Sequence, residues 1–107
     1  MKLTREDVIE LLKIKTIKSL SNLDLSYLDL SFIDFNKYDL INIKLNNCDL
    51  MGCKFRNTNF FEVNLLESNI TTSCLYKSLF YKCKMEKRIM EYLTKFEYAK
   101  VVNYKLD

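Results

Sequence analysis

The chain has 107 residues, which is the size of one domain, and it contains no histidine, no tryptophan and no proline. Its 17 Lys and Arg exceed its 14 Asp and Glu by a net charge of only +3, which is too small to mark a nucleic-acid-binding protein. Because histidine is the commonest general base and metal ligand, and because no apolar stretch resembles a signal peptide or a membrane span, we expect a cytoplasmic protein with no catalytic site, no metal and no cofactor.

Residues 1–19 have the pattern of a helix that caps one end of the fold. Thr4 stands in the position of an N-cap, and Asp7, three residues later, completes a capping box. An apolar stripe follows at helical spacing, made of Val8, Leu11, Leu12, Ile14 and Ile17.

A large apolar residue stands at every fifth position from Leu20 to Met85, fourteen positions in all. A helix repeats after about 3.6 residues and a strand after about 2, so neither produces a strict period of five. Such a period is typical of a solenoid, in which stacked coils bury a continuous apolar column. The units, written to end on the central apolar residue, read SNLDL, SYLDL, SFIDF, NKYDL, INIKL, NNCDL, MGCKF, RNTNF, FEVNL, LESNI, TTSCL, YKSLF and YKCKM.

These thirteen units resemble the pentapeptide-repeat family, whose loose consensus is A-(D/N)-L-X-X, although Leu, Ile or Tyr replaces the Ala in the first five units. The resemblance implies a right-handed quadrilateral β-helix with four units per coil, so that residues twenty apart stack. We therefore expect an all-β solenoid with helical caps, a single domain over 1–107 with a helical cap over 1–19, a β-helix over 20–85 and a helix or tail over 86–107. The expected inner ladders are Leu25, Leu45, Leu65 and Met85; Leu30, Leu50 and Ile70; Phe35, Phe55 and Leu75; and Leu40, Phe60 and Phe80.

Residues 86–107 leave the period of five. Apolar residues at helical spacing predict a helix over 86–100, and they are Ile89, Leu93, Phe96 and Ala99. Residues 101–106 fit either a final strand or a tail. Because an open coil end exposes unpaired backbone, we expect the helix to cap the solenoid. Its second, aromatic face, with Tyr92, Phe96 and Tyr98, permits a homodimer, for which the family resemblance supplies a precedent; a monomeric cap is the alternative.

The four cysteines are expected to be free thiols in a reducing compartment. Cys48, Cys53 and Cys83 fall two residues before a centre, where the side chain should point inward. They lack CxxC spacing, so we interpret them as small apolar fillers of narrow corners and not as zinc ligands. Cys74 directly precedes a centre and is expected to point outward, with nothing obvious to activate it.

An acidic residue directly precedes the centre in five early units, at Asp24, Asp29, Asp34, Asp39 and Asp49. The repeat needs a turn-compatible polar residue there, which explains these carboxylates without catalysis. The alternative is an acidic patch that imitates DNA, because the resemblance includes DNA mimics that bind type II topoisomerases. Residues 51–85, however, hold five basic and two acidic side chains, so a mimic that covers the whole surface is disfavoured.

Outward apolar residues are the strongest functional signal. Ile41, Phe61 and Tyr81 follow their centres at a spacing of twenty and should form one exposed ladder, flanked by Leu79 and rimmed by Lys82 and Glu62. A contiguous apolar stripe rich in aromatic residues marks an interface, unless a terminal helix covers it. Tyr27 and Phe32 also point outward, and we expect them to pack under the N-terminal helix.

These features predict a non-catalytic protein-binding module. Its expected partner is a nucleic-acid-processing enzyme, either a type II topoisomerase, as the resemblance implies, or a defence nuclease bound by an anti-CRISPR-type inhibitor. Inhibition would follow from occlusion or partial DNA mimicry; the alternative is a structural or oligomerisation module with no inhibitory role. Direct nucleic-acid binding is disfavoured because the net charge is small and because Glu86 and Glu91 dilute the basic cluster of Lys77, Lys82, Lys84, Lys87 and Arg88.

Overall fold

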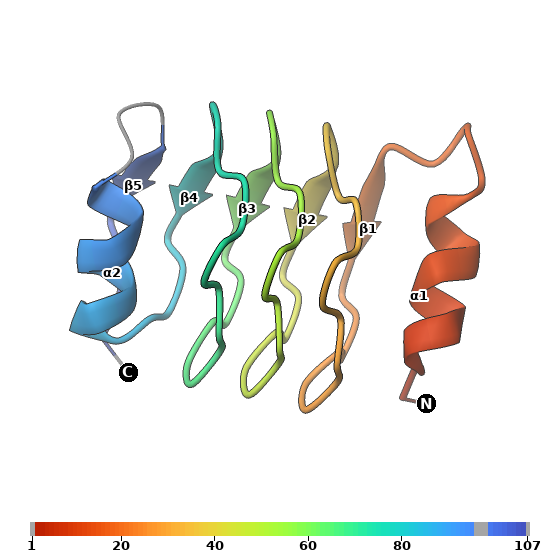
Figure 1. The fold of residues 1–107 in the computed structure, drawn as a ribbon, viewed down its shortest axis with the longest axis horizontal. Helices are drawn as coiled ribbons and strands as arrows, with labels where there is room; N and C mark the ends of the chain where they lie inside the picture. Colours follow the sequence, from red (N-terminus) through yellow and green to blue (C-terminus); the bar gives the residue numbers. More distant parts are fainter. Residues whose placement is uncertain (1, 96–98, 107) are drawn as a thin grey trace.

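Stacked parallel coils form the body of the protein (Figure 1). The computed structural model describes residues 2–95 and 99–106. In chain order the elements are α1 (Arg5–Leu12), β1 (Ser19–Ser21), β2 (Asp39–Ile41), β3 (Asn59–Phe61), β4 (Leu79–Tyr81), α2 (Lys87–Thr94) and β5 (Lys100–Val102). The five strands make one parallel sheet in the order β1-β2-β3-β4-β5, so each coil adds one strand beside the last.

The register of the sheet confirms the inner ladders expected from the period of five. Leu40 pairs with Phe60, and Phe60 pairs with Phe80, each twenty residues apart. The rings of Phe60 and Phe80 stack with centroids 4.2 Å apart, and those of Phe35 and Phe55 stack at 5.4 Å. All fourteen central residues from Leu20 to Met85 are buried. The apolar column is therefore continuous from the first coil to the last.

The coil turns a corner at every fifth residue through a positive φ angle. Thirteen consecutive corners, from Asn22 to Lys82, have φ between 50° and 69°, and only Gly52 among them is a glycine. The left-handed conformation costs an L-residue about 1–2 kcal/mol. Ten of these corners offset this cost with a backbone hydrogen bond to the next coil, as from the N–H of Tyr27 to the carbonyl oxygen of Asn46 at 3.0 Å. The N–H groups of Glu67 and Thr72 donate instead to the side chains of Glu86 and Tyr92.

Gly52 is needed for space and not for its φ angle, because other residues adopt the same angle at neighbouring corners. A Cβ atom at Gly52 would overlap the ring of Phe32 on the preceding coil. The missing side chain thus lets the Phe32 ring lie over the backbone of the second coil.

The helix α1 covers the start of the stack, as expected, but it is shorter than predicted. Its capping box is confirmed: the N–H of Asp7 donates to Thr4 Oγ1 at 3.2 Å, and the N–H of Thr4 donates to Asp7 Oδ2 at 2.9 Å. The helix ends at Leu12 instead of continuing to residue 19, because residues 13–18 must cross the coil end and deliver Ser19 into register with Asp39.

The bulky residues of the first coil provide the surface on which α1 packs. Leu23, Leu28 and Tyr38 occupy the place of the family's small alanine and are only half-buried, whereas the same position in later coils is fully buried. The hydroxyl of Tyr38 donates to the carbonyl oxygen of Leu12 at 3.2 Å. Large side chains are tolerated in this coil because a helix, and not another coil, lies beyond it.

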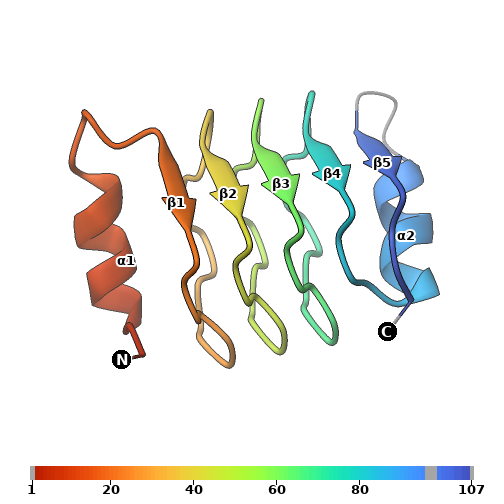
Figure 2. The same ribbon diagram turned by 180° about the vertical axis from the view of Figure 1, so that it is seen from behind.

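The helix α2 replaces two sides of the last coil, after which the chain returns to the sheet. Ile89 and Leu93 are buried on its inner face, as predicted. The helix ends at Thr94, so the predicted extension to residue 100 is wrong, and Ala99 lies beyond the helix. Residues 100–102 form β5, which resolves the choice between a strand and a tail; its register with β4 is shifted by 21 because α2 adds one residue to the coil. The two helices lie at opposite ends of the stack (Figure 2).

The neighbours Phe60 and Phe61 provide a test of which side chains face inward. We expect Phe60→Ala to lower the free energy of unfolding by about 3–5 kcal/mol, because Phe60 is 1% exposed, stacks on Phe80 and meets Phe55 edge to face. Phe61→Ala removes the same atoms from a half-exposed position on the outer face and should cost well under half as much. Urea unfolding followed by circular dichroism measures both, and equal losses would contradict the register.

Gly52 and Phe32 should be energetically coupled. In a Phe32→Ala background, Gly52→Ala should cost about 1–2 kcal/mol, the penalty of the left-handed backbone alone. In the wild-type background the cost should be larger, because the new Cβ also displaces the ring. Urea unfolding of the four proteins in this double-mutant cycle gives the coupling. An identical cost in both backgrounds would show that the ring does not hold this position.

Candidate functional site

An apolar ladder runs across the outer surface of the sheet, at right angles to its strands. Ile41 on β2, Phe61 on β3 and Tyr81 on β4 are paired in register, as predicted. The rings of Phe61 and Tyr81 meet edge to face with centroids 6.4 Å apart. Each outward side chain thus supports its neighbour on the next coil.

The ladder is one member longer than the sequence indicated. Val102 on β5 pairs with Tyr81 and is 40% exposed, similar to Ile41 at 39%. The period of five could not place Val102 in the ladder, because α2 interrupts the period and shifts the register by one residue. Only the short apolar run after the C-terminal helix, which contains the β-branched Val102, indicated a further strand there.

The rim of the ladder is polar on one side and mixed on the other. Lys82 and Glu62 lie at the corner that follows the ladder, both with positive φ, and the Lys82 ammonium lies 5.4 Å from the centroid of the Tyr81 ring. On the other side, Leu79 is half-buried beside Asn59, whose amide donates to Asp39 Oδ1 at 2.9 Å. The predicted flanking residues are therefore brought together around the ladder.

Neither helix covers the ladder. Figure 2 shows the sheet in front, with α1 beyond β1 and α2 behind β5. The alternative in which a terminal helix buries the ladder is therefore wrong. A solvent-facing apolar stripe on a regular sheet is the arrangement found at protein interfaces.

Comparison with known families supports the architecture. The sequence model described as pentapeptide repeats (8 copies) matches residues 39–75, the segment that forms the second coil and most of the third. The chain therefore contains a pentapeptide-repeat solenoid. No curated protein and no solved structure matches it, so its partner must be argued from its own surface.

Two outward aromatic residues of this pentapeptide-repeat protein lie where we did not expect them. Tyr27 is 71% exposed and Phe32 is 73% exposed, so the prediction that they pack under the N-terminal helix is wrong. Both stand at corners of the first coil, and corner side chains project away from the stack instead of along it. The helix packs instead on the bulky side chains of the first coil, so the two rings are not needed to fill the space beneath it.

The five early carboxylates do not form an acidic patch. They are spread around the first coil and the start of the second, and only Asp29 and Asp49 lie in the same column. Asp24 pairs across coils with Lys44, and Asp34 with Lys54. A spacing of five in a coil of twenty places successive residues on different sides, so a run of such acids encircles the coil.

These carboxylates serve the turns, as the structural interpretation proposed. Asp24 Oδ1 accepts hydrogen bonds from the Ser26 N–H at 3.0 Å and the Ser26 hydroxyl at 2.6 Å. These bonds, with smaller contributions from Lys2 and Lys44, lower the pKa of Asp24 to about 2. The equivalent bonds from Ser31 lower the pKa of Asp29.

The buried cysteines act as small corner fillers, as interpreted, and they also donate hydrogen bonds. The thiol of Cys48 lies 2.9 Å from the Leu25 carbonyl oxygen, and that of Cys53 lies 3.0 Å from the Leu30 carbonyl oxygen. Thr58 makes the same contact through its hydroxyl, which explains why Cys, Ser and Thr share this position. Burial raises the pKa of Cys53 and of Cys83 to about 11.

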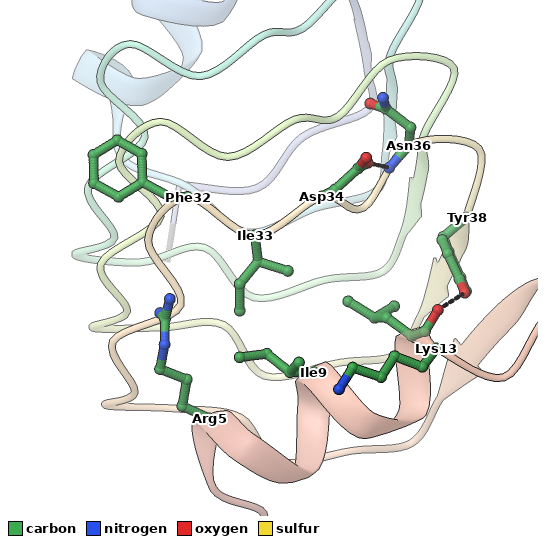
Figure 3. A pocket seen from close by; sticks show the side chains of 9 residues that line it. Arg5, Ile9, Lys13, Phe32, Ile33, Asp34, Asn36 and Tyr38 are labelled. Carbon is green, nitrogen blue, oxygen red and sulfur yellow. Dashed lines mark hydrogen bonds between the residues drawn. The ribbon is translucent and has the colours of Figure 1, made fainter.

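A concave surface that the sequence did not predict separates α1 from the first coil (Figure 3). Its volume is about 500 Å³, and its apolar lining includes Ile9 and Ile33. The polar groups around it hold the helix in place: the Arg5 guanidinium donates to the carbonyl oxygens of Asp29 and Ser31, both at 2.9 Å. The cleft is best understood as the seam between the cap and the solenoid.

The predicted dimer face is described only in part. The hydroxyl of Tyr92 accepts a hydrogen bond from the Thr72 N–H at 3.2 Å, so this ring reaches back to the solenoid. Phe96 and Tyr98 lie outside the described residues.

Within residues 2–95 and 99–106, no three His, Cys, Asp or Glu side chains gather as metal ligands. No helix in the described segments is long and apolar enough to cross a bilayer.

Thiol burial predicts the order of alkylation. In the folded protein we expect iodoacetamide at mildly alkaline pH to label Cys74 first, because it alone among the four cysteines is not buried. Cys53 and Cys83 should remain protonated and unreactive below their raised pKa of about 11. Peptide mass spectrometry locates the label, and a Cys74→Ser variant should take up almost none until urea is added. Rapid labelling of Cys53 in the folded protein would contradict this burial.

Proposed function

We propose that this pentapeptide-repeat protein is a non-catalytic, cytoplasmic protein-binding module that inhibits a nucleic-acid-processing enzyme by occlusion. The observation that carries the proposal is the ladder of Ile41, Phe61, Tyr81 and Val102, which crosses four strands in register and is covered by neither helix. Large aromatic side chains on a rigid surface are the residues that dominate binding energy at interfaces.

The side chains that elsewhere perform chemistry have structural roles here, which supports a binding function over catalysis. Asp24 and Asp29 hold turns through serine N–H and hydroxyl groups. Cys48, Cys53 and Cys83 are buried, with raised pKa values. The sequence has no histidine to activate a nucleophile.

Occlusion fits the charge distribution better than DNA mimicry does. A mimic needs carboxylates in rows on one face, whereas here they encircle the first coil and alternate with lysines across coils. The target classes remain those implied by the family resemblance and by the small size of the chain: a type II topoisomerase or a defence nuclease.

A purified panel of type II topoisomerases and RNA-guided nucleases tests the proposal. The wild-type protein should inhibit at least one enzyme, measured by DNA supercoiling or cleavage on agarose gels. The Phe61→Lys/Tyr81→Asp variant should inhibit on the order of 100-fold less well, because two central aromatic contacts are lost. Circular dichroism should show that this variant stays folded.

The matched control replaces two exposed aromatic residues elsewhere, as Tyr27→Asp/Phe32→Lys, and should inhibit as the wild type does. Light scattering after gel filtration examines the alternative function. A stable dimer that the ladder substitutions dissociate, with no enzyme inhibited, would favour a structural or oligomerisation module and overturn the proposal.

A further inference from the structure

A basic groove lies directly beside the ladder, on the next side of the coil. It has a volume of about 250 Å³, and four lysines line it: Lys44, Lys82, Lys84 and Lys105. Glu62 is the single carboxylate among its lining residues. None of these four lysines forms an ion pair with another residue in the described segments.

The lysines are stacked in a way that folding alone does not favour. Lys84 and Lys105 stand directly opposite each other on neighbouring coils, where the strands are about 4.8 Å apart. Like charges at such positions repel and destabilise the sheet. Nearer the start of the same column, residues of opposite charge, Asp24 and Lys44, stand opposite each other instead. The repulsion at the C-terminal end would be relieved by an anion bound between the two ammonium groups.

The groove and the ladder form one continuous surface. Lys82 joins them, because it lines the groove while its ammonium lies 5.4 Å from the Tyr81 ring centroid. A partner anchored on the ladder must therefore place its adjoining residues over the lysines. Opposite charge at this position would speed association and fix the orientation of the complex.

We propose that the groove binds the carboxylate side chains of a short acidic segment in the partner protein. This inference rests on the proposed function, in which the ladder is the surface that anchors the partner. A short protein segment fits better than a nucleic acid because exposed Ile41 and Val102, which adjoin the groove, offer nothing to a phosphate backbone.

The groove can be tested on the full chain without knowing the partner. Hexaglutamate titrated into the ¹⁵N-labelled protein should shift the backbone amides of Lys82, Lys84 and Lys105 in heteronuclear NMR spectra, and the shifts should shrink as salt is added. Lys84→Gln/Lys105→Gln should weaken this binding about fivefold or more. The matched control, Lys13→Gln/Lys15→Gln, removes two exposed lysines near α1 and should bind as the wild type does.

The outcomes separate this inference from the proposed function. Phe61→Ala/Tyr81→Ala should lose enzyme inhibition yet keep hexaglutamate binding, because it spares the groove. Absence of groove shifts at millimolar hexaglutamate, or equal weakening by both lysine variants, would overturn the inference. Groove shifts with a thymidine hexanucleotide but not with hexaglutamate would also overturn it and assign the groove to nucleic acid.

Discussion

The structure depends on the hydrogen bonding of each coil to the next with a register of twenty residues. The central N–H groups donate across coils, as from Leu25 to the Lys44 carbonyl oxygen at 2.9 Å, and most corner N–H groups do the same. These bonds compensate the positive φ angles, so almost any residue is accepted at a corner. Because the register is fixed, every surface feature is a column, and a substitution changes one member of that column without moving the others.

The open coil at each end of the stack is covered in a different way. At the start, α1 packs on the bulky residues of the first coil, and its Arg5 donates to two carbonyl oxygens of that coil. At the other end, α2 takes the place of two sides and the chain then adds β5 to the sheet. The second solution lengthens the outer face of the sheet and so extends both the ladder, through Val102, and the groove, through Lys105.

Most of the repeat could be predicted from the sequence, because a period of five specifies the direction of each side chain. The inner ladders, the inward cysteines and the in-register ladder of Ile41, Phe61 and Tyr81 all followed from position alone. What failed were features that depend on where the ends dock. The helix lengths and the exposed positions of Tyr27 and Phe32 require knowing which surface each cap covers, and the register of Val102 required knowing that α2 adds one residue.

A surface of this kind suits binding because its side chains are organised before the partner arrives. Ordering flexible side chains at an interface costs about 0.5–1.5 kcal/mol for each one. In the ladder, Phe61 and Tyr81 already hold each other edge to face, and the strands beneath them are fixed by hydrogen bonds on both sides. The protein therefore needs no deep pocket to bind tightly. In the proposed complex, apolar anchors on a rigid sheet would supply the affinity, and the lysines of the groove would determine how the partner approaches.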